Sequence, residues 1–535
     1  MNWLRPVPRT ISRARSAIAG RRIASPSCIR YTSTRHPASI AELLRPSLSA
    51  SNTPDTPKEG SSLTISGYVR TIRKQKRVAF AAIGDGSTLQ TVQAVLAPQL
   101  ADGLSTGAAV TITGQWSTSL GQGQSFELQV TDVQVLGDND ATTYPIQKKY
   151  QTPEFLRTKP HLRSRLPFNS LLLRLRSLVT AQVTSYFAQQ DFVQCHPPII
   201  TSSDCEGAGE VFTVAPEAPA TKDQITSGKM QPHEDAFFGS TKYLTVSSQL
   251  HLEALAQSVN KVWTLSPTFR AERSDTARHL SEFYMLEAEL AFVDDVNKVM
   301  DVVEDMLRAV TIKLQTSDIG RELLDVKERN PEQDSTSVTR EVLAQRWQGL
   351  TAGPWPRITY DAAIQHLQGA VAQGQVQFDF APNHDAGLQT EHERFLADSV
   401  GQGGPVFVTD YPRNIKPFYM APSKDSALST HTMPTVACFD LLVPELCELA
   451  GGSMREHRLQ ELLHSMKAHN LQHATQAGGE TPEGSLEWYV DLRRYGSVPH
   501  GGFGLGFDRL LCYLSGVSNI RDVVNFPRWH KRCDC

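Results

Sequence analysis

The sequence predicts an α+β protein in which a small five-stranded β-barrel precedes a larger domain that mixes helices and strands. Three observations lead to this prediction. The chain has 535 residues, which is too many for one ordinary hydrophobic core. Short β-type segments, separated by Gly, Asp and Ser turns, fill residues 63–136. The remainder contains long helical periodicities interspersed with β-type runs.

The first 41 residues differ in composition from the rest of the chain. They contain eight arginines and many serines, and the first acidic residue is Glu42. Such a leader is typical of an organellar transit peptide. We interpret residues 1–41 as a mitochondrial transit peptide, which predicts a location in the mitochondrial matrix. A basic tail that binds RNA is the alternative. Residues 42–62, rich in Ser, Pro and Thr, are the predicted linker.

Residues 63–138 are the predicted barrel domain. The β-type runs are LTISGYVRTIR, RVAFAAIGDG, LQTVQAVLAP, AAVTITGQWS and SFELQVTDVQVLG. Five short strands in so small a domain are typical of the closed barrels that bind oligonucleotides, and a small β-sandwich is the alternative. A connector rich in Pro, Lys and Arg follows at residues 139–168.

The larger domain is predicted for residues 169–535. Its first helix is expected to begin near Asn169 or Ser170, a plausible cap. Two stretches, 214–235 and 470–485, have the composition of loops or insertions. The apolar face predicted for the first helix consists of Leu172, Leu175, Val179, Val183, Tyr186 and Phe187.

Bulk properties exclude several classes of protein. The formal net charge is −3, so any surface for RNA must be a local basic patch. No run of about 18 apolar residues predicts a membrane span. Eight cysteines occur without a CxxC pair, which gives no support for structural zinc and favours a reducing compartment over a disulfide framework.

A polar loop between two β-type runs, within residues 263–290, is the first candidate for chemistry. The first run ends in Phe-Arg270-Ala-Glu272, the loop is RSDTARHL, and the chain returns as Ser-Glu282-Phe283. Arg273, Arg278 and His279 lie in the loop, where cations above a sheet would suit a polyphosphate. Phe283 could stack on a base. A solvated loop with incidental charges is the alternative.

Two further clusters lie near the C-terminal end. The segment GGFGLGFDRLLCYL, 501–514, contains glycines that allow a close backbone approach to a ligand, followed by Arg509 at the start of a helix. Its spacing is not the GxGxxG of dinucleotide-binding proteins. Asp440, Glu445 and Glu448 precede GGSMR, which ends in Arg455. Neighbouring carboxylates suit Mg²⁺, although such a pair is more often a solvated face.

Together these clusters resemble the signature motifs of class II aminoacyl-tRNA synthetases. Motif 1 resembles the helix at 170–190 with FVQCHPPIIT, in which Pro198 takes the position of the motif's proline. Motif 2 resembles FRAERSDTARHLSEF, and motif 3 resembles GFGLGFDRL. The resemblance implies an antiparallel β-sheet flanked by helices and a homodimer formed through motif 1. The barrel resembles the anticodon-binding domain of the subgroup for aspartate, asparagine and lysine.

Within that subgroup the asparagine branch fits best. TSSDCEGAGEVF, LTVSSQLHLEAL, VTDYPRNIKPFYM and DLRRYGSVPHGGFGLGF all resemble it. Aspartate-specific members have a lysine three residues beyond the glutamine that matches Gln249, and here that position is Leu252, followed by Glu253. A carboxylate accepts hydrogen bonds from an NH₂ group and repels another carboxylate, so Glu253 is expected to select an amide over an acid.

The resemblance implies an ATP-dependent ligation of L-asparagine to tRNA(Asn) through an asparaginyl-adenylate, with Mg²⁺ as a second cofactor. Asp440 and Glu448 are the implied metal ligands. The implied asparagine contacts are Glu206, Gln249, Glu253 and Arg455. The implied ATP contacts, of which Arg270 and Arg509 are catalytic, are Arg270, Glu272, Arg278, His279, Glu282, Phe283, Glu448 and Arg509.

For the barrel, the resemblance implies that Phe80 and Gln93 read the anticodon, one by stacking on a base and the other by a hydrogen bond to a base edge. A core Phe and a surface Gln are the alternative. Three other functions remain open. They are an aspartyl-tRNA synthetase of relaxed tRNA specificity, a catalytically inactive RNA-binding paralogue and an ammonia-dependent asparagine synthetase.

Overall fold

The structure is a computed structural model. It describes residues 38–44, 57–119, 121, 124–146, 150–202, 211–215, 237–238, 241–329, 338–424, 434–471 and 486–535. Most of the predicted transit peptide and of the predicted loops at 214–235 and 470–485 therefore lies outside the described residues. None of the described helices is long and apolar enough to cross a membrane.

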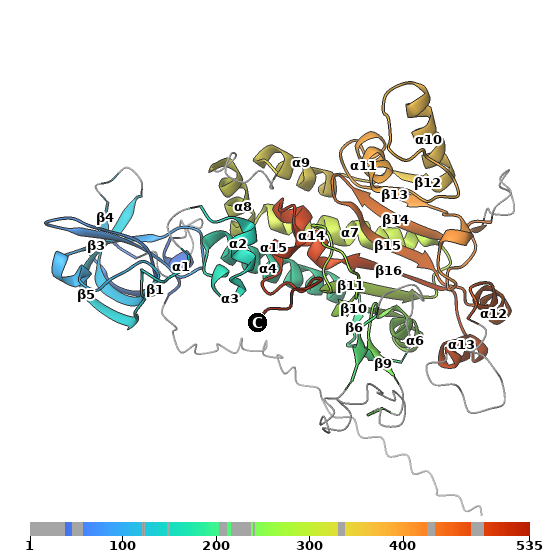
Figure 1. Cartoon of the computed structure of the whole chain (residues 1–535), viewed down its shortest axis with the longest axis horizontal. Coiled ribbons are helices and arrows are strands. Elements are labelled where there is room, and N and C mark those ends of the chain that lie inside the picture. Colours follow the sequence, from blue (N-terminus) through green and yellow to red (C-terminus); the bar gives the residue numbers. More distant parts are fainter. Residues whose placement is uncertain are drawn as a thin grey trace, which may run out of the picture. The chain divides into compact units, whose positions relative to one another are not determined.

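The first domain is a closed five-stranded barrel, as predicted. Its strand order is β1-β2-β3-β5-β4, with antiparallel pairs throughout except for the parallel pair β3–β5. Alternate residues point inward, and this alternation produces the apolar core. The strands, visible in Figure 1, are β1 Ser62–Lys74, β2 Ala79–Gly84, β3 Val92–Leu96, β4 Ala109–Thr118 and β5 Phe126–Gly137, with a 3-10 turn η1 at Pro98–Ala101.

A short helix, α1 (Ile40–Leu44), belongs to this barrel rather than to the predicted leader or linker. Ile40 and Leu43 are buried in the barrel core. The backbone N–H of Ile40 donates to Asp85 at 2.9 Å, and that of Ala41 donates to Ser87 at 3.0 Å. Two apolar side chains three residues apart, on either side of the predicted division at residue 41, therefore seal the barrel core here.

The second domain is built on an eight-stranded sheet with the order β12-β13-β14-β15-β16-β11-β10-β6 (Figure 1). Its central pairs are antiparallel, and the outer pairs β12–β13 and β10–β6 are parallel. The strands are β6 Val193–Gln194, β10 Lys261–Phe269, β11 Glu282–Ala291, β12 Arg357–Thr359, β13 Val406–Thr409, β14 Cys438–Val443, β15 Cys447–Met454 and β16 His500–Gly506. A small separate sheet contains β7 Ile200–Thr201, β9 Lys242–Leu244 and β8 Thr213–Val214.

Helices pack on this sheet and complete the core. The long helices α4 and α7 contact each other, and α7 also contacts β14, β15 and β16. The helices are α2 Pro153–Arg157, α3 Pro160–Arg163, α4 Pro167–Gln189, α6 Gln249–Val259, α7 Val296–Gln315, α8 Asp318–Arg329, α9 Arg340–Thr351, α10 Tyr360–Ala372, α11 Thr390–Ser399, α12 Leu459–Ala468, α13 Glu487–Arg494, α14 Phe507–Ser515 and α15 Ile520–Val523, with a 3-10 turn η2 at Arg413–Ile415.

Helix α4 begins earlier than the sequence analysis predicts. Pro167 occupies its first turn, and Leu166 is the N-terminal cap. Ser170 lies inside the helix, where its hydroxyl donates to the carbonyl of Pro167 at 2.8 Å. Proline is favoured at the first helical position, since its missing N–H is one that the helix would leave unpaired. The predicted apolar face is confirmed, with five of its six residues buried and Tyr186 partly buried.

Candidate active site

A cavity of about 150 Å³ lies against the antiparallel centre of the large sheet. It receives side chains from the β10–β11 hairpin, from β15, and from the junction of β16 with α14. The hairpin and that junction are more than two hundred residues apart in the sequence. The sheet order brings these segments together, because β16 lies between β11 and β15. The lining residues are Arg270, Glu272, Arg278, His279, Leu280, Phe283, Met285, Glu448, Leu449, Ala450, Gly504, Gly506, Asp508, Arg509 and Ile520.

The hairpin presents a cation and an aromatic ring side by side. Thr268 pairs with Phe283 in the ladder, and the N–H of Arg270 donates to the carbonyl of Ser281 at 3.0 Å just beyond it. The Arg270 guanidinium lies 5.6 Å from the centroid of the Phe283 ring. This cation–π geometry holds a positive charge beside an aromatic face that is open to the cavity. The arrangement suits a ligand that has both an anion and a flat ring.

The loop between these strands is organised around His279. Its Nδ1 lies 3.0 Å from the hydroxyl of Ser274 and 2.5 Å from that of Thr276, and its Nε2 lies 3.4 Å from Glu272. Arg278 reaches across to the β14–β15 turn, where it donates to the carbonyl of Glu445 at 3.1 Å. The predicted loop cations therefore include two that line the cavity, His279 and Arg278.

Arg509 closes the opposite side of the cavity. It lies in the first turn of α14, directly after β16, and donates to the carbonyl of Glu448 at 3.1 Å. The glycines of β16 leave room for neighbouring groups. At Gly502, a Cβ would collide with the Glu289 carboxylate and the carbonyl of Ala288. The glycine-rich segment thus allows side chains of β11 to lie where a larger residue would exclude them.

Asp440 and Glu448 approach each other at this end of the cavity. Asp440 Oδ1 and Glu448 Oε1 lie 3.3 Å and 3.4 Å from the position that a Cβ on Gly451 would occupy. Burial, together with the charge of Asp440, raises the pKa of Glu448. Lys416 forms an ion pair with Asp440 at 2.8 Å. The third acid of the predicted cluster, Glu445, lies instead at the turn and pairs with Arg346 at 2.5 Å.

Glu393, in the first turn of α11, is a further acid that the sequence analysis does not identify. Burial raises its pKa to about 7, and the charges of Glu448 and Asp440 add to this effect. Glu393 gives little sequence signal, since an acid in the first turn of an amphipathic helix is common. Among the described residues, no group of three or more His, Cys, Asp and Glu side chains is arranged to hold a metal ion.

A buried charge network lies where β11, β15, β16, α6 and α13 meet. Two carboxylates, Glu253 and Glu289, alternate with two guanidiniums, Arg455 and Arg493. All four side chains have an exposed fraction of 4% or less. Burial would lower the pKa of Arg455, but the two carboxylates outweigh burial and raise it. The network holds two negative and two positive charges.

Glu253 has the larger number of partners. Its Oε2 accepts from Arg493 at 2.6 Å, from the Tyr489 hydroxyl at 2.8 Å and lies 3.1 Å from Nε2 of His500. Its Oε1 accepts from the Gln249 side-chain amide at 3.0 Å. Burial acts to raise the pKa of Glu253, but the cationic partners outweigh it and the pKa is lowered.

Glu289 is a second acid that the sequence analysis does not identify. Arg455 Nη2 donates to its Oε2 at 3.0 Å and Arg455 Nε donates to its Oε1 at 3.2 Å. Burial raises the pKa of Glu289 despite the charge of Arg455. A sequence signal was available, since Glu287 and Glu289 interrupt the apolar strand MLEAELAF at alternate positions, and acids in a buried strand require partners. Glu287 is held by the Ser247 hydroxyl and by the N–H of Ser248, at the start of α6.

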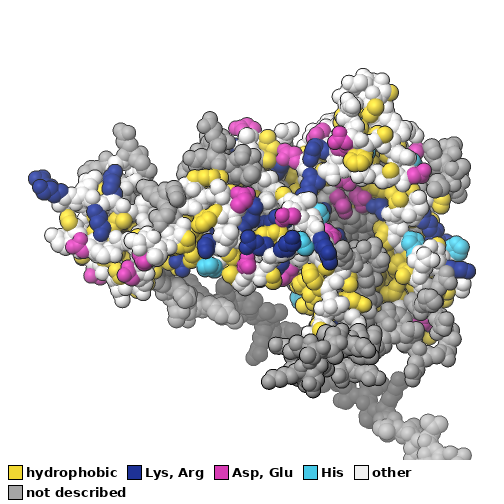
Figure 2. All heavy atoms as spheres, viewed as in Figure 1, with side chains coloured by type: hydrophobic (Ala, Val, Ile, Leu, Met, Phe, Trp, Pro, Cys, Tyr) yellow, Lys and Arg dark blue, Asp and Glu magenta, His cyan; other side chains and the backbone are white. Residues whose placement is uncertain are grey.

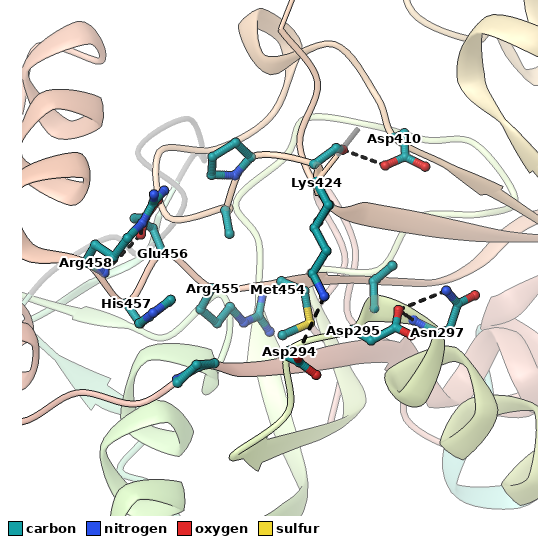
Figure 3. Close-up of a pocket in the computed structure, with 16 residues that line it drawn as sticks. Asp294, Asp295, Asn297, Asp410, Lys424, Met454, Arg455, Glu456, His457 and Arg458 are labelled. Atoms are coloured by element: carbon teal, nitrogen blue, oxygen red, sulfur yellow. Dashed lines mark hydrogen bonds and ion pairs between the residues drawn. The ribbon is translucent and has the colours of Figure 1, made fainter. Parts of the chain in front are cut away.

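Arg455 also lines a second cavity, of about 570 Å³, shown in Figure 3. Two cations of this cavity are paired with acids, one distant in the sequence and one nearby. Lys424 lies 3.7 Å from Asp294, which precedes α7, and Arg458 lies 2.8 Å from Glu456. In Figure 3, Arg455 and Met454 lie between His457 on one side and Asp294 on the other. The lining also includes Asp295 and Asp410, so four acids face the three cations Lys424, Arg455 and Arg458.

Several of the predicted ligand contacts do not line the first cavity, namely Gln249, Glu253, Glu282, Asp440 and Arg455. Glu206 lies outside the described residues. Glu282 is exposed at the start of β11, where it forms an isolated antiparallel bridge with Arg528, and it does not line the cavity.

On the barrel, Phe80 and Gln93 lie on the outer face of neighbouring strands. Each alternates with buried residues, and the ladder pairs Phe80 with Val95 and Ala82 with Gln93, so the two side chains are diagonal neighbours. The Arg73 guanidinium lies 5.3 Å from the Phe80 ring, and the Gln93 amide donates to Glu127 at 3.3 Å. Phe80 is therefore a surface residue and not a core residue of the barrel.

The chain matches two families of known proteins. Residues 152–530 match the tRNA synthetases of class II for D, K and N, and residues 63–136 match the OB-fold nucleic acid binding domain. The mitochondrial asparagine–tRNA ligase of Saccharomyces cerevisiae is 40% identical over 481 residues, with 87% of this chain and 92% of the yeast protein covered. The asparagine–tRNA ligase of Geobacter sulfurreducens is 42% identical over 477 residues, with 88% of this chain and 95% of the bacterial protein covered.

Solved structures give the same result. The asparaginyl-tRNA synthetase of Pyrococcus horikoshii, complexed with asparaginyl-adenylate, superposes with a TM-score of 0.73 at 28% identity and covers 93% of this chain and 99% of that protein. The enzyme of Entamoeba histolytica, also in complex with asparaginyl-adenylate, has a TM-score of 0.70 at 27% identity, with 90% and 98% covered.

Proposed function

The chain belongs to the asparaginyl-tRNA synthetases of class II, and from that premise we propose that the 150 Å³ cavity binds ATP and that the buried charge network around Arg455 selects asparagine. The enzyme is an asparagine–tRNA ligase that uses ATP. It activates the carboxylate of asparagine as an adenylate and then transfers the asparaginyl group to tRNA. The convergence of Arg270, Phe283, Arg509, Asp440 and Glu448 at one end of the sheet is the observation that carries the proposal.

On the ATP side, Arg270 and Phe283 act as one unit. Arg270 is placed to neutralise the α-phosphate and the attacking carboxylate, while Phe283 stacks on the adenine. Arg509 is assigned to the γ-phosphate, and the loop residues His279 and Arg278 to the distal phosphates. Because the transfer has no protein nucleophile, the rate depends on positioning and on charge neutralisation. Glu272 is assigned to holding the loop, whereas Glu282 does not line the cavity and loses the role that the resemblance implied.

Asp440 and Glu448 fit a magnesium ion. Their oxygens face the space that the missing side chain of Gly451 leaves open, and carboxylate oxygens are the ligands that Mg²⁺ prefers. Two carboxylates are enough when phosphate oxygens complete the coordination shell. A bound Mg²⁺ would neutralise phosphate charge. Lys416 would hold Asp440 in its ligand position through their ion pair.

Asparagine selection is assigned to Arg455 together with Glu289. The four donors around Glu253 already occupy both of its oxygens, so we revise its role from accepting the substrate amide to positioning Gln249 and the arginines. Within the part of the chain that the structure describes, Glu289 accepts hydrogen bonds only from Arg455, which leaves lone pairs for an amide NH₂. Gln249 donates its NH₂ to Glu253, so its carbonyl oxygen is directed at the substrate ammonium. Glu206 keeps the same assignment by resemblance.

We also propose a homodimer formed through motif 1. Its strand β6 is at the edge of the large sheet. Val193, Ile199 and Ile200 are 45%, 39% and 39% exposed on this segment, an apolar exposure that a second copy would cover. Sedimentation equilibrium of the wild type and of Ile200→Lys tests this, with a dimer expected for the first and a monomer for the second. A monomeric wild type would contradict the proposal.

We propose the mitochondrial matrix as the location. The composition of the leader supports this, and so do the mitochondrial enzymes of Saccharomyces cerevisiae and Schizosaccharomyces pombe at 40% identity. A fusion of residues 1–50 to a fluorescent protein is expected to enter mitochondria, and replacement of the leader arginines by glutamine is expected to prevent this. A cytosolic wild-type fusion would contradict it.

ATP–pyrophosphate exchange, with asparagine and aspartate tested separately, measures the proposed roles. Exchange is expected with asparagine alone, and Arg270→Ala or Arg509→Ala is expected to reduce it by at least a hundredfold. Asp440→Asn and Glu448→Gln are expected to raise the Mg²⁺ concentration needed for half-maximal exchange. Glu445→Gln, at the nearby turn, is the matched control. An unchanged Mg²⁺ requirement in the first two variants would refute the metal assignment.

A further inference from the structure

The C-terminal segment of the chain packs against the loop that contains His279. We call residues 273–281 the phosphate loop and residues 520–529 the brace. The N–H of Ile520 donates to the carbonyl of Ala277 at 3.0 Å, and the N–H of Ser281 donates to the carbonyl of Arg528 at 2.7 Å. Ile520 itself lines the proposed ATP cavity. The brace therefore contacts the phosphate loop at two separated points and reaches the site.

Arg521 makes the strongest of these contacts. Its Nη1 forms an ion pair with Asp275 at 3.0 Å, and its Nη2 donates to the carbonyl of Thr276 at 3.0 Å. The guanidinium lies 4.7 Å from the centroid of the Trp529 ring. The Arg521 side chain is only 7% exposed, whereas Asp275 is 79% exposed. A buried guanidinium thus holds an otherwise exposed loop by charge-assisted hydrogen bonds.

The position of Thr276 connects this contact to the chemistry. Its carbonyl accepts from Arg521, and its hydroxyl lies 2.5 Å from Nδ1 of His279. Release of Thr276 would therefore remove one of the contacts that position the imidazole, which also lies near Ser274 and Glu272. Figure 2 shows Lys and Arg side chains gathered on the face of the molecule where the chain ends. Positive side chains that lie close together repel one another. The loop therefore keeps one geometry only where specific contacts hold it.

The brace is itself fixed to the helices that precede α4. Arg163, which is buried, donates to the carbonyl of Arg521 at 2.9 Å and to that of Asn525 at 3.1 Å. Asp522 forms an ion pair with Arg157 at 2.7 Å. These contacts leave the segment from Arg521 to Asn525 little freedom. A segment that is itself fixed can hold the loop in one conformation. A mobile segment would have to become ordered together with the loop, so it could not reduce the entropy that is lost when the loop becomes ordered.

We propose that the brace is a positioning device for ATP, in which Arg521, stacked on Trp529, holds the phosphate loop in its binding geometry before ATP arrives. The proposal rests on the proposed function, since the phosphate loop is assigned there to the distal phosphates. Without the brace, ATP must order the loop itself, and that entropy is lost from its affinity. Asparagine binds through other residues, so its affinity is not coupled to the loop. Arg521 and Trp529 are thus positioning residues.

The test uses the full-length enzyme in ATP–pyrophosphate exchange. Arg521→Met keeps the apolar stem but removes the charge and both hydrogen bonds, and Trp529→Leu removes the ring. Both are expected to raise the KM for ATP at least tenfold while changing the KM for asparagine less than twofold. Trp529→Phe keeps an aromatic face and is expected to restore most of the ATP affinity. Arg532→Ala, whose side chain pairs with Asp534 in the exposed tail, is the matched control.

Trypsin cleavage provides a readout that does not depend on activity, because the phosphate loop contains Arg273 and Arg278. In Arg521→Met, cleavage at these residues is expected to become faster, and saturating ATP is expected to slow it again. Unchanged ATP affinity would overturn the proposal, as would an equal rise in both KM values. Slow cleavage in Arg521→Met would also overturn it. Wild-type enzyme that lacks exchange with asparagine would instead refute the proposed function, and the cleavage rates would still report on the brace.

Discussion

Arg493 and Glu253 form an ion pair of 2.6 Å in which neither side chain is exposed to solvent. The pair belongs to a network in which Arg455 and Arg493 balance Glu253 and Glu289. A pocket with balanced charge accepts the neutral side chain of asparagine without adding a charge. The carboxylate of aspartate would enter as an uncompensated negative charge, which is costly in a buried site. Under the proposed assignment, the balance of the network would favour an amide over an acid together with the individual hydrogen bonds.

Glu253→Gln is expected to destabilise the protein, because it leaves the buried Arg493 without its anionic partner. Removal of one member of a buried pair costs about 3–5 kcal/mol in the free energy of unfolding. Urea unfolding measures this cost. Glu487→Gln removes the partner of Arg494 from a more exposed pair and is expected to cost at most about 1 kcal/mol. Equal losses in the two variants would contradict the importance given to the buried pair.

Glu289→Gln is expected to weaken the preference for asparagine. The substitution keeps the shape of the side chain but leaves the network with an excess positive charge, which favours aspartate. Loss of a charged acceptor for the substrate amide is expected to cost about 2 kcal/mol, or roughly thirtyfold in kcat/KM for asparagine. Exchange rates with both amino acids give the ratio. A ratio equal to that of the wild type would assign selection to a different residue.

Glu393 is expected to make stability depend on pH in the absence of Mg²⁺. Burial raises its pKa from 4.5 to about 7, with Glu448 and Asp440 adding to the effect. The folded protein then binds this proton more tightly than the unfolded chain, so stability falls as the pH rises from about 4.5 to 7. The loss is roughly 3 kcal/mol. Urea unfolding at pH 5 and pH 8 is expected to show a smaller difference for Glu393→Gln than for the wild type, and identical differences would contradict the shift.

Phe80→Ala is expected to weaken tRNA binding without changing amino acid activation. Base stacking on an aromatic side chain contributes about 1–3 kcal/mol, so the Kd for tRNA(Asn) is expected to rise roughly 5- to 150-fold. Filter binding measures the Kd, and exchange in the absence of tRNA measures activation. Phe126→Ala removes an aromatic side chain of the same barrel that stacks on Trp116 and is the comparison. Equal effects of the two variants would mean that Phe80 acts through barrel stability.

The elements of the fold with strong local patterns were predictable. The alternation of apolar residues located all five barrel strands, and the apolar face of α4 followed from its helical period. Elements that form only by packing against distant parts of the chain were not predictable. Ile40 and Leu43 are too few to define a helix by sequence, and only the barrel surface that they cover makes them one.

The residues of the candidate site likewise fall into two groups, those that local motifs predict and those that depend on distant contacts. Arg270, His279, Phe283 and Arg509 were identifiable because their motifs are local, and the sheet brings these motifs to one cavity. The roles of Glu253 and Glu289 depend on contacts between β11, α6, α13 and β15, which no single segment contains. The family resemblance around Gln249 suggested Glu253, but its Oε2 is occupied by residues more than two hundred positions later in the chain.

The order of strands in the large sheet affects how the protein is made. Strand β16 is the last strand of this sheet along the chain, and it lies between β11 and β15. It therefore joins two parts of the sheet that are synthesised earlier. Until residues 500–506 have left the ribosome, β11 and β15 each present an unpaired edge, which is a surface that promotes association with other chains. In a growing chain these edges therefore stay open to association until the final strand is available. A messenger truncated before that strand would direct synthesis of an aggregation-prone product.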